Sequence, residues 1–257
     1  MCRHLAYVGP PVTLAALLLD PPHGLLHQSY APADMRGGGT VNADGFGAGW
    51  YPRSPDGAPV EPARYRSDRP LWGDTGFAAL AAVTPATAVL AAARSATVGM
   101  PVTTAAAAPF AEGPWLFSHN GVVRGWPDTV TALAAALPVR DLVTLEAPTD
   151  AALLWALVRH RLRGGADPAA ALAGTVLDVD AAAPGSRLNL LLTDGTAVWA
   201  TTWTHALSVR PAPGAVTVAS EPTDTGPGWT AVPDRHLVVA APGRCDVVPL
   251  GAAARAA

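Results

Sequence analysis

The second residue of this 257-residue chain is a cysteine, in the opening run Met1-Cys2-Arg3-His4-Leu5. If Met1 is removed, Cys2 carries both a thiol, which is a strong nucleophile, and a free α-amine, which is a known activating base for such a nucleophile. An unperturbed thiol has a pKa of about 8.5 and an α-amine one of about 7.7–8.0, so protons can pass between them near neutral pH. Because direct transfer within one residue is cramped, we expect a bridging water. By position alone, Cys2 reads more simply as a small apolar residue, so the interpretation depends on residues downstream.

A thiolate that attacks an amide carbonyl also needs hydrogen-bond donors for the oxyanion that forms. The segment Ser118-His119-Asn120-Gly121 offers two such donors, the side-chain amide of Asn120 and the backbone N–H of Gly121. It lies at the end of a predicted strand, residues 114–123. The alternative interpretation is an ordinary Asn-Gly hairpin turn.

Two charged residues could recognise the acyl side of a substrate. Arg94 lies in the run Ala93-Arg94-Ser95-Ala96-Thr97-Val98-Gly99, and its guanidinium forms a planar fork that matches a carboxylate. The alternative is a solvated surface arginine. Asp150 follows Thr149 at a predicted helix start, where it either pairs with a substrate ammonium group or caps the helix. The glycine-rich run 42–50 permits close backbone packing near the chain terminus, or forms a bulged strand.

Composition excludes several other classes of chemistry. The chain has a net charge of −3, and all 17 basic residues are arginine. The absence of lysine excludes a P-loop, a Schiff-base lysine and a Ser-Lys dyad. No charge run favours nucleic acid or an anionic membrane, and the absence of a signal peptide or an apolar span indicates a cytoplasmic protein. His23 and His27 have a spacing that could hold a metal, but we expect unrelated loop histidines, with no metal and no cofactor.

Hydrophobic spacing predicts strands at both ends of the chain around a central helical block. The predicted helices cover residues 11–19, 75–83, 128–137, 150–162 and 167–177, with Asp128 and Asp150 as N-caps. The predicted strands cover residues 3–8, 46–51, 88–93, 114–123, 188–192, 197–203, 216–220, 237–241 and 246–250. This order predicts two sheets covered by helices in one α+β domain.

Taken together and in this order, the motifs resemble those of the class II (N-terminal nucleophile) glutamine amidotransferases. The shared features are a cysteine directly after the initiator Met, a DGxGxGW-like segment, RxATxG, an HNG turn and a Thr/Ser-Asp helix start. The resemblance spans roughly residues 2–222, including Leu188-Asn189-Leu190 and Ala219-Ser220-Glu221-Pro222. It implies a four-layer αββα sandwich, with two antiparallel sheets between helical layers, as a single domain over residues 2–257.

The resemblance also implies a role for each matched residue. Cys2 would be the nucleophile and its own amine the base. Asn120 and Gly121 would stabilise the oxyanion. Arg94 and Thr97 would hold the α-carboxylate of a glutamyl group, and Asp150 its α-ammonium group.

This chain departs from the common family pattern around the pocket. Ser95 and Val98 replace the bulkier Trp and His of the RWATHG form, and Ala151-Ala152 replaces the Ser-Glu that often follows the aspartate. We expect the smaller Ser95 and Val98 to leave room for a large leaving group. Replacing Ser95 with Trp would test that expectation.

The opening nine residues, the segment Gln28–Pro32 and the segment Thr40–Gly45 resemble a stand-alone subgroup of this family, the amidases of ergothioneine biosynthesis. Such enzymes remove glutamate from γ-glutamyl-hercynylcysteine S-oxide through a γ-glutamyl thioester. Hydrolysis without ammonia transfer also fits a chain of this length. Two alternatives stay open: a glutaminase subunit that delivers ammonia to a partner synthase, and a non-catalytic domain that binds a glutamyl ligand. A homodimer also stays open.

Overall fold

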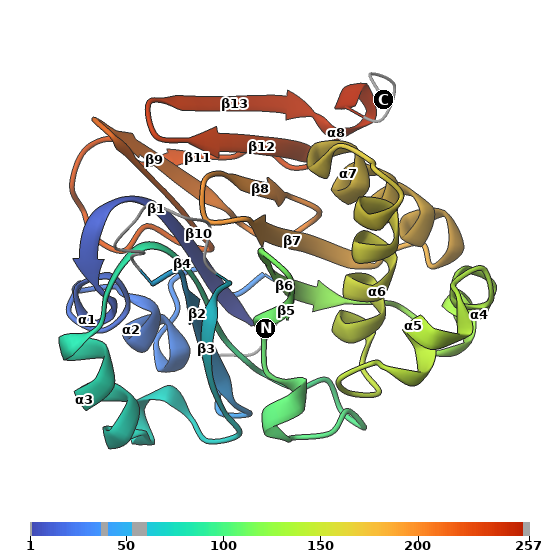
Figure 1. The fold of residues 1–257 in the computed structure, drawn as a ribbon, viewed down its shortest axis with the longest axis horizontal. Coiled ribbons are helices and arrows are strands. Elements are labelled where there is room, and N and C mark those ends of the chain that lie inside the picture. The colour runs from blue at the N-terminus through green and yellow to red at the C-terminus, as the bar shows by residue number, and fades with distance from the viewer. Residues whose placement is uncertain (1, 37–40, 53–60, 254–257) are drawn as a thin grey trace.

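Two antiparallel sheets form the centre of the computed structural model, which describes residues 2–36, 41–52 and 61–253 (Figure 1). The first sheet has the order β11-β9-β10-β1-β4-β2-β3, and the second has the order β13-β12-β8-β7-β6-β5. The first sheet comprises β1 (Arg3–Thr13), β2 (Phe46–Trp50), β3 (Ala63–Ser67), β4 (Pro85–Ala93), β9 (Ser208–Ala212), β10 (Ala215–Ala219) and β11 (Thr230–Ala231). The second comprises β5 (Phe110–Glu112), β6 (Trp115–Val122), β7 (Arg187–Thr193), β8 (Val198–Thr201), β12 (His236–Ala241) and β13 (Arg244–Pro249).

Helices cover the outer face of each sheet, which gives the four layers αββα and confirms the predicted fold class (Figure 1). On the first sheet lie α1 (Leu14–Leu18), α2 (Leu25–Tyr30) and α3 (Thr75–Val83). On the second lie α4 (Thr131–Ala135), α5 (Val139–Val143), α6 (Asp150–Arg163), α7 (Pro168–Ala182) and α8 (Leu250–Ala253). Three short 3₁₀ turns complete the set: η1 (Leu71–Gly73), η2 (Thr104–Ala106) and η3 (Asp128–Val130).

The core consists of three apolar clusters, one under each helical layer and one between the sheets. Because side chains alternate along a strand, β6 contributes to two of these clusters: Leu116 packs between the sheets and Phe117 packs under the helices. Both side chains are completely buried. The strand that carries Asn120 and Gly121 is therefore held from both faces.

Several predicted boundaries are wrong. Pro11 lies in β1 instead of opening a helix, because α1 begins only after Thr13, whose hydroxyl caps it. Asp128 does not cap a helix and begins the 3₁₀ turn η3. The helix predicted to end near residue 177 continues as α7 to Ala182. The strand predicted over residues 197–203 shortens to β8.

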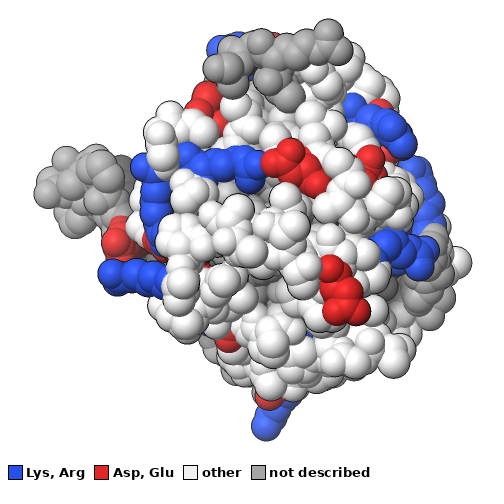
Figure 2. Space-filling view, turned by 90° about the vertical axis from the view of Figure 1, so that its right-hand side faces the viewer, with Lys and Arg blue, Asp and Glu red and all other residues white. Residues whose placement is uncertain are grey.

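Charged side chains of both signs are interspersed on the face that Figure 2 shows. On α6 and α7, Arg161 pairs with Asp178, and Arg163 of α6 pairs with Glu112. Among the described residues, the structure contains no helix with the length and apolar character needed to cross a bilayer.

Candidate active site

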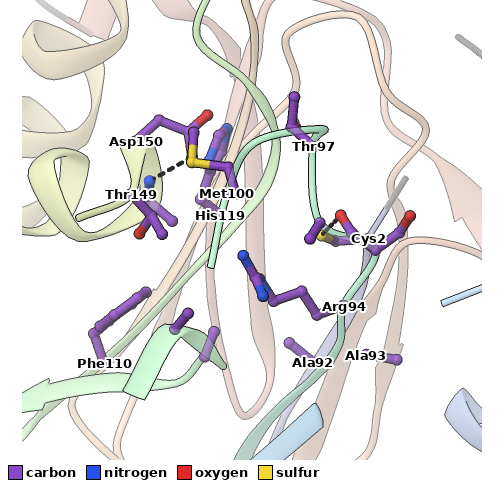
Figure 3. A pocket seen from close by; sticks show the side chains of 16 residues that line it. Cys2, Ala92, Ala93, Arg94, Thr97, Met100, Phe110, His119, Thr149 and Asp150 are labelled. Carbon is purple, nitrogen blue, oxygen red and sulfur yellow. Dashed lines mark hydrogen bonds between the residues drawn. The ribbon is translucent and has the colours of Figure 1, made fainter. Parts of the chain in front are cut away.

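Five of the residues singled out from the sequence line one cavity, where the start of β1, the end of β4, β6 and the first turn of α6 meet (Figure 3). They are Cys2, Arg94, Thr97, Gly121 and Asp150. Strand register explains the first pairing: Arg3 of β1 lies opposite Ala93 of β4, so the antiparallel ladder brings Cys2 next to Arg94. Met1 lies outside the described residues.

The Cys2 thiol is half-buried at the edge of this cavity. Its Sγ lies 3.6 Å from the carbonyl oxygen of Ser95, to which it donates a hydrogen bond. Ser95 itself lines the cavity. The loop after β4 therefore holds the thiol as well as supplying Arg94.

Asp44 fixes the backbone of that loop. Its N–H donates to the Arg94 carbonyl at 3.0 Å, and its carboxylate accepts from the Ala96 N–H at 2.8 Å. The Arg94 N–H in turn donates to the carbonyl of Gly45 at 2.8 Å. Gly45 has a φ of +108°, and a Cβ there would lie 2.7 Å from the Ser67 carbonyl, so this turn requires glycine. The glycine-rich run thus has a definite structural role.

The guanidinium of Arg94 extends into the middle of the cavity, with Cys2 on one side and Thr149 and Asp150 on the other (Figure 3). Its Nη1 donates to the carbonyls of Pro101 at 2.9 Å and Asp44 at 3.3 Å. Among the described residues Arg94 forms no ion pair, in contrast to the arginines of the helical face. Its charge therefore stays available to a ligand. Thr97, by contrast, is exposed at the rim.

Asn120 and Gly121 lie inside β6, so the alternative interpretation of an ordinary Asn-Gly hairpin turn is wrong. They pair with Asn189 and Leu188 of β7. A Cβ on Gly121 would lie 1.8 Å from the carbonyl oxygen of Arg187, so this close approach of two strands requires glycine. The backbone of Gly121 faces the cavity, whereas the buried side chain of Asn120 does not line it and donates to Ser220 Oγ at 3.4 Å.

Asp150 is the first residue of α6 and not its N-cap, so the predicted capping role of Asp150 is wrong. The cap is Thr149, whose hydroxyl accepts from the Ala152 N–H at 3.2 Å. The Asp150 carboxylate accepts from the N–H groups of Val123 at 3.0 Å and Ala151 at 2.7 Å. The bond from Val123 attaches the start of α6 to the residue that follows β6. A carboxylate has about four acceptor positions, so these bonds leave capacity for a ligand ammonium group.

Buried histidines behind the site were not assigned a role from the sequence. His4 is completely buried, and its Nδ1 lies 3.3 Å from Ser118 Oγ. Burial, assisted by His119, His205 and Arg3, lowers the pKa of His4 to about 3. Burial and the nearby Arg187 lower the pKa of His205 to about 3 as well. Both rings are therefore neutral at neutral pH. In the sequence, the location of His4 two residues after Cys2 was the signal that a histidine lies near the site.

Glu221 is the second group that sequence reasoning left without a role. Its buried carboxylate pairs with Arg3 at 2.9 Å and with His23 Nε2 at 2.6 Å, and accepts from the N–H groups of Ala33 at 2.9 Å and Asp34 at 3.1 Å. The Arg3 guanidinium also donates to the carbonyls of Cys2 and Asp34. Glu221 thus fixes the strand next to the nucleophile. In the sequence, only the match of Ala219–Pro222 to the family pattern pointed to Glu221.

Two smaller expectations are corrected by the same geometry. Val98 is 101% exposed and does not line the cavity, so its small size does not enlarge the pocket. His23 and His27 are not unrelated loop residues, because their Nδ1 atoms lie 3.0 Å apart and His27 belongs to α2. The described residues nevertheless contain no group of three His, Cys, Asp or Glu that could hold a metal ion.

Comparison with solved structures supports the class of fold. The chain is similar to a glutamine aminotransferase class-II domain protein from Silicibacter pomeroyi, with a TM-score of 0.69 and 23% identity, over 96% of this chain and 99% of that one. No protein-family model matches the sequence. The fold is that of the N-terminal nucleophile amidotransferases.

Curated relatives are more specific. A protein named gamma-glutamyl-hercynylcysteine sulfoxide hydrolase from Mycolicibacterium smegmatis is 46% identical over 97% of this chain and 100% of its own length. A protein of the same name from Mycobacterium tuberculosis is 44% identical over 93% of this chain and 92% of its own length. The chain belongs to this family of class II amidotransferase-fold hydrolases and is an enzyme, which excludes the non-catalytic ligand-binding alternative.

Proposed function

We propose that this enzyme hydrolyses the γ-glutamyl amide of γ-glutamyl-hercynylcysteine S-oxide, giving glutamate and hercynylcysteine S-oxide in ergothioneine biosynthesis, with Cys2 as the nucleophile. The observation that carries the proposal is a pair of opposite charges that face one cavity beside a thiol. Neither Arg94 nor Asp150 forms an ion pair with another side chain among the described residues. A glutamyl group carries the complementary pair, an α-carboxylate and an α-ammonium group.

The proposed binding mode follows from the donors and acceptors that line the cavity. The Arg94 guanidinium, with Thr97 at the rim, donates hydrogen bonds to the planar α-carboxylate. The carboxylate of Asp150, held rigidly by two backbone N–H groups, accepts from the α-ammonium group. The glutamyl γ-carbonyl then points toward Cys2. The names of the relatives, at 44% and 46% identity, support this choice of substrate.

The proposed reaction is acyl transfer in two stages. The Cys2 thiolate attacks the γ-carbonyl, while Asn120 and the Gly121 N–H stabilise the oxyanion. The α-amine of Cys2, freed by removal of Met1, passes the thiol proton to the leaving amine, and a γ-glutamyl thioester remains. Water activated by the same amine then releases glutamate and restores the thiol. No metal or organic cofactor takes part in these steps.

Product analysis tests the proposal with two substrates, the γ-glutamyl sulfoxide conjugate and free glutamine. We expect glutamate release from the conjugate by the wild type, and none by Cys2→Ala at unchanged thermal stability. A variant with residues added before Cys2 should also be inactive, because its α-amine becomes an amide. Full activity of a preparation whose intact mass retains Met1 would contradict the role of the amine, and full activity of Cys2→Ala would contradict the nucleophile. Faster turnover of glutamine than of the conjugate would contradict the substrate.

A further inference from the structure

One buried hydroxyl connects the strand of the nucleophile to the strand of the oxyanion donors. Ser220 directly follows β10, and its N–H donates to the carbonyl of His4 at 2.9 Å. Its Oγ accepts in turn from the His4 N–H at 3.0 Å. Ser220 therefore extends the pairing of β10 with β1 as far as His4, which is two residues after Cys2. Since Asn120 Nδ2 also donates to this Oγ at 3.4 Å, one side chain contacts both sheets.

The hydrogen-bond inventory of this cluster contains a mismatch. Asn120 Oδ1 is a buried acceptor without a partner among the described residues. The Ser220 hydroxyl carries one hydrogen, yet in its described contacts it acts only as an acceptor. A buried acceptor without a donor is costly, and the unused Ser220 hydroxyl hydrogen lies on an oxygen that is 3.4 Å from the other terminal atom of the same carboxamide, Nδ2.

A half-turn of the Asn120 carboxamide pairs Oδ1 with the unused hydroxyl hydrogen and moves the unpaired position to Nδ2, a donor. The turn exchanges the positions of Nδ2 and Oδ1, so Ser220 O–H donates to Oδ1 while still accepting from the His4 N–H. Both hydrogens of Nδ2 are then free of Ser220. This is the orientation that an oxyanion donor requires, because only the N–H side of the amide can stabilise negative charge.

We propose that Ser220 is a positioning residue that orients Asn120, passing a hydrogen-bond chain from the His4 N–H through its own hydroxyl to Asn120 Oδ1. The inference rests on the proposed function, because it assigns Asn120 to the oxyanion. Ser220 does not line the cavity that holds Cys2 and Arg94, so its proposed effect on the reaction passes through Asn120. It acts by excluding the amide orientation that would turn Oδ1 toward the developing charge.

The test compares Ser220→Ala and Ser220→Thr in steady-state kinetics with the γ-glutamyl sulfoxide conjugate. We expect Ser220→Ala to lower kcat at least about 10-fold, a part of the ~10²–10³-fold that one oxyanion donor supplies, with KM unchanged. Ser220→Thr keeps the hydroxyl and should retain most of the activity. Ser118→Ala is the comparison variant, because it removes the His4 contact between these strands without touching Asn120, and so measures the cost of loosening the strands alone.

A double-mutant cycle separates positioning from a merely structural role. In an Asn120→Ala background, Ser220→Ala should cost little further, because the amide that it orients is gone. An equal loss in both backgrounds, or an equal loss for Ser220→Thr and Ser220→Ala, would overturn the inference. If Ser220→Ala fails to fold, Ser220→Cys replaces it, since a thiol is a weak donor of similar shape.

The same series distinguishes this inference from the proposed function. If Cys2→Ala and Asn120→Ala both lose activity while Ser220→Ala does not, only the inference fails. If Cys2→Ala or Asn120→Ala keeps wild-type turnover, the proposed mechanism fails and the inference falls with it.

Discussion

Replacing Gly121 with alanine is the most direct test of the backbone oxyanion donor. The added methyl group would lie 1.8 Å from the Arg187 carbonyl oxygen, 2.6 Å from its carbonyl carbon and 2.6 Å from His119 Nε2. Two of these contacts involve backbone of the paired strand β7, which cannot rotate away. Strand β6 must therefore separate from β7 by more than about 1 Å, and a misplacement of that size can cost ~10²-fold in rate.

We expect Gly121→Ala to lower kcat for the conjugate about 100-fold, together with a loss of about 1–3 kcal/mol in the free energy of unfolding from overpacking. Turnover is measured per folded molecule, with the folded fraction taken from urea denaturation. Gly76→Ala in α3 is the matched control, since its Cβ would lie 3.5 Å from the nearest atom, Asp74 Oδ1. That variant should keep wild-type kinetics and should not lose stability, because alanine costs less conformational entropy in a helix than glycine does.

The result that would refute this reasoning is a Gly121→Ala enzyme that turns over within a few-fold of the wild type per folded molecule. Such a result would mean that the Gly121 N–H does not hold the oxyanion or that β7 accommodates the methyl group. A loss of stability without loss of turnover would separate the packing of Gly121 from its proposed chemistry.

Three further predictions concern the charge pair, the pocket wall and pH. Arg94→Lys should lower kcat/KM for the conjugate ~10–100-fold, because about 1.5–3 kcal/mol of charged hydrogen bonding is lost; steady-state kinetics showing no change would refute the carboxylate clamp. Ser95→Trp should reduce turnover of the conjugate far more than that of glutamine, and equal losses on both would remove the argument from pocket size. His4 and His205 have folded pKa values of about 3, below that of an unfolded histidine, so the unfolded state binds more protons below about pH 6.5. Stability should therefore fall as pH drops from 7 to 5, approaching about 1.4 kcal/mol per pH unit for each histidine. His205→Gln should reduce this slope in urea denaturation, and an unchanged slope would refute the assignment of the pH dependence to this buried ring.

Hydrophobic spacing was sufficient to predict two sheets covered by helices, whereas the four-layer sandwich and most of the cavity wall were implied by the family resemblance. The alternation and glycine pattern predicted the strands that carry Gly121 and the end of β4, and the order of motifs assembled residues far apart in the chain. The short strands β3, β5, β9 and β11 were missed, because strands of this length lack a clear apolar period and depend on their neighbours for pairing.

Two of the wrong interpretations concern residues whose local structure is decided by contacts with distant parts of the chain. An Asn-Gly pair favours a turn, but pairing with β7 over the whole of β6 overrides that preference. Thr149 and Asp150 are both good N-cap residues, and only the contact of the Asp150 carboxylate with the Val123 N–H decides between them. Ser220 and Glu221 contact residues near the chain start, more than 180 positions away, so their roles could not be read from neighbouring sequence.

The division of the site between the two sheets explains why the residues behind it are so extensively hydrogen-bonded. Cys2 and Arg94 adjoin the ends of β1 and β4 in the first sheet, whereas Asn120 and Gly121 lie in β6 of the second sheet, to whose end the start of α6 is bonded. The distance from thiol to oxyanion donor therefore depends on how the sheets pack, and apolar contacts between them are not directional. Directional contacts come from His4, which bonds to Ser118, and from Ser220, which bonds to His4 and Asn120. Because burial keeps the His4 ring neutral, this link between the sheets adds no charge next to the thiol.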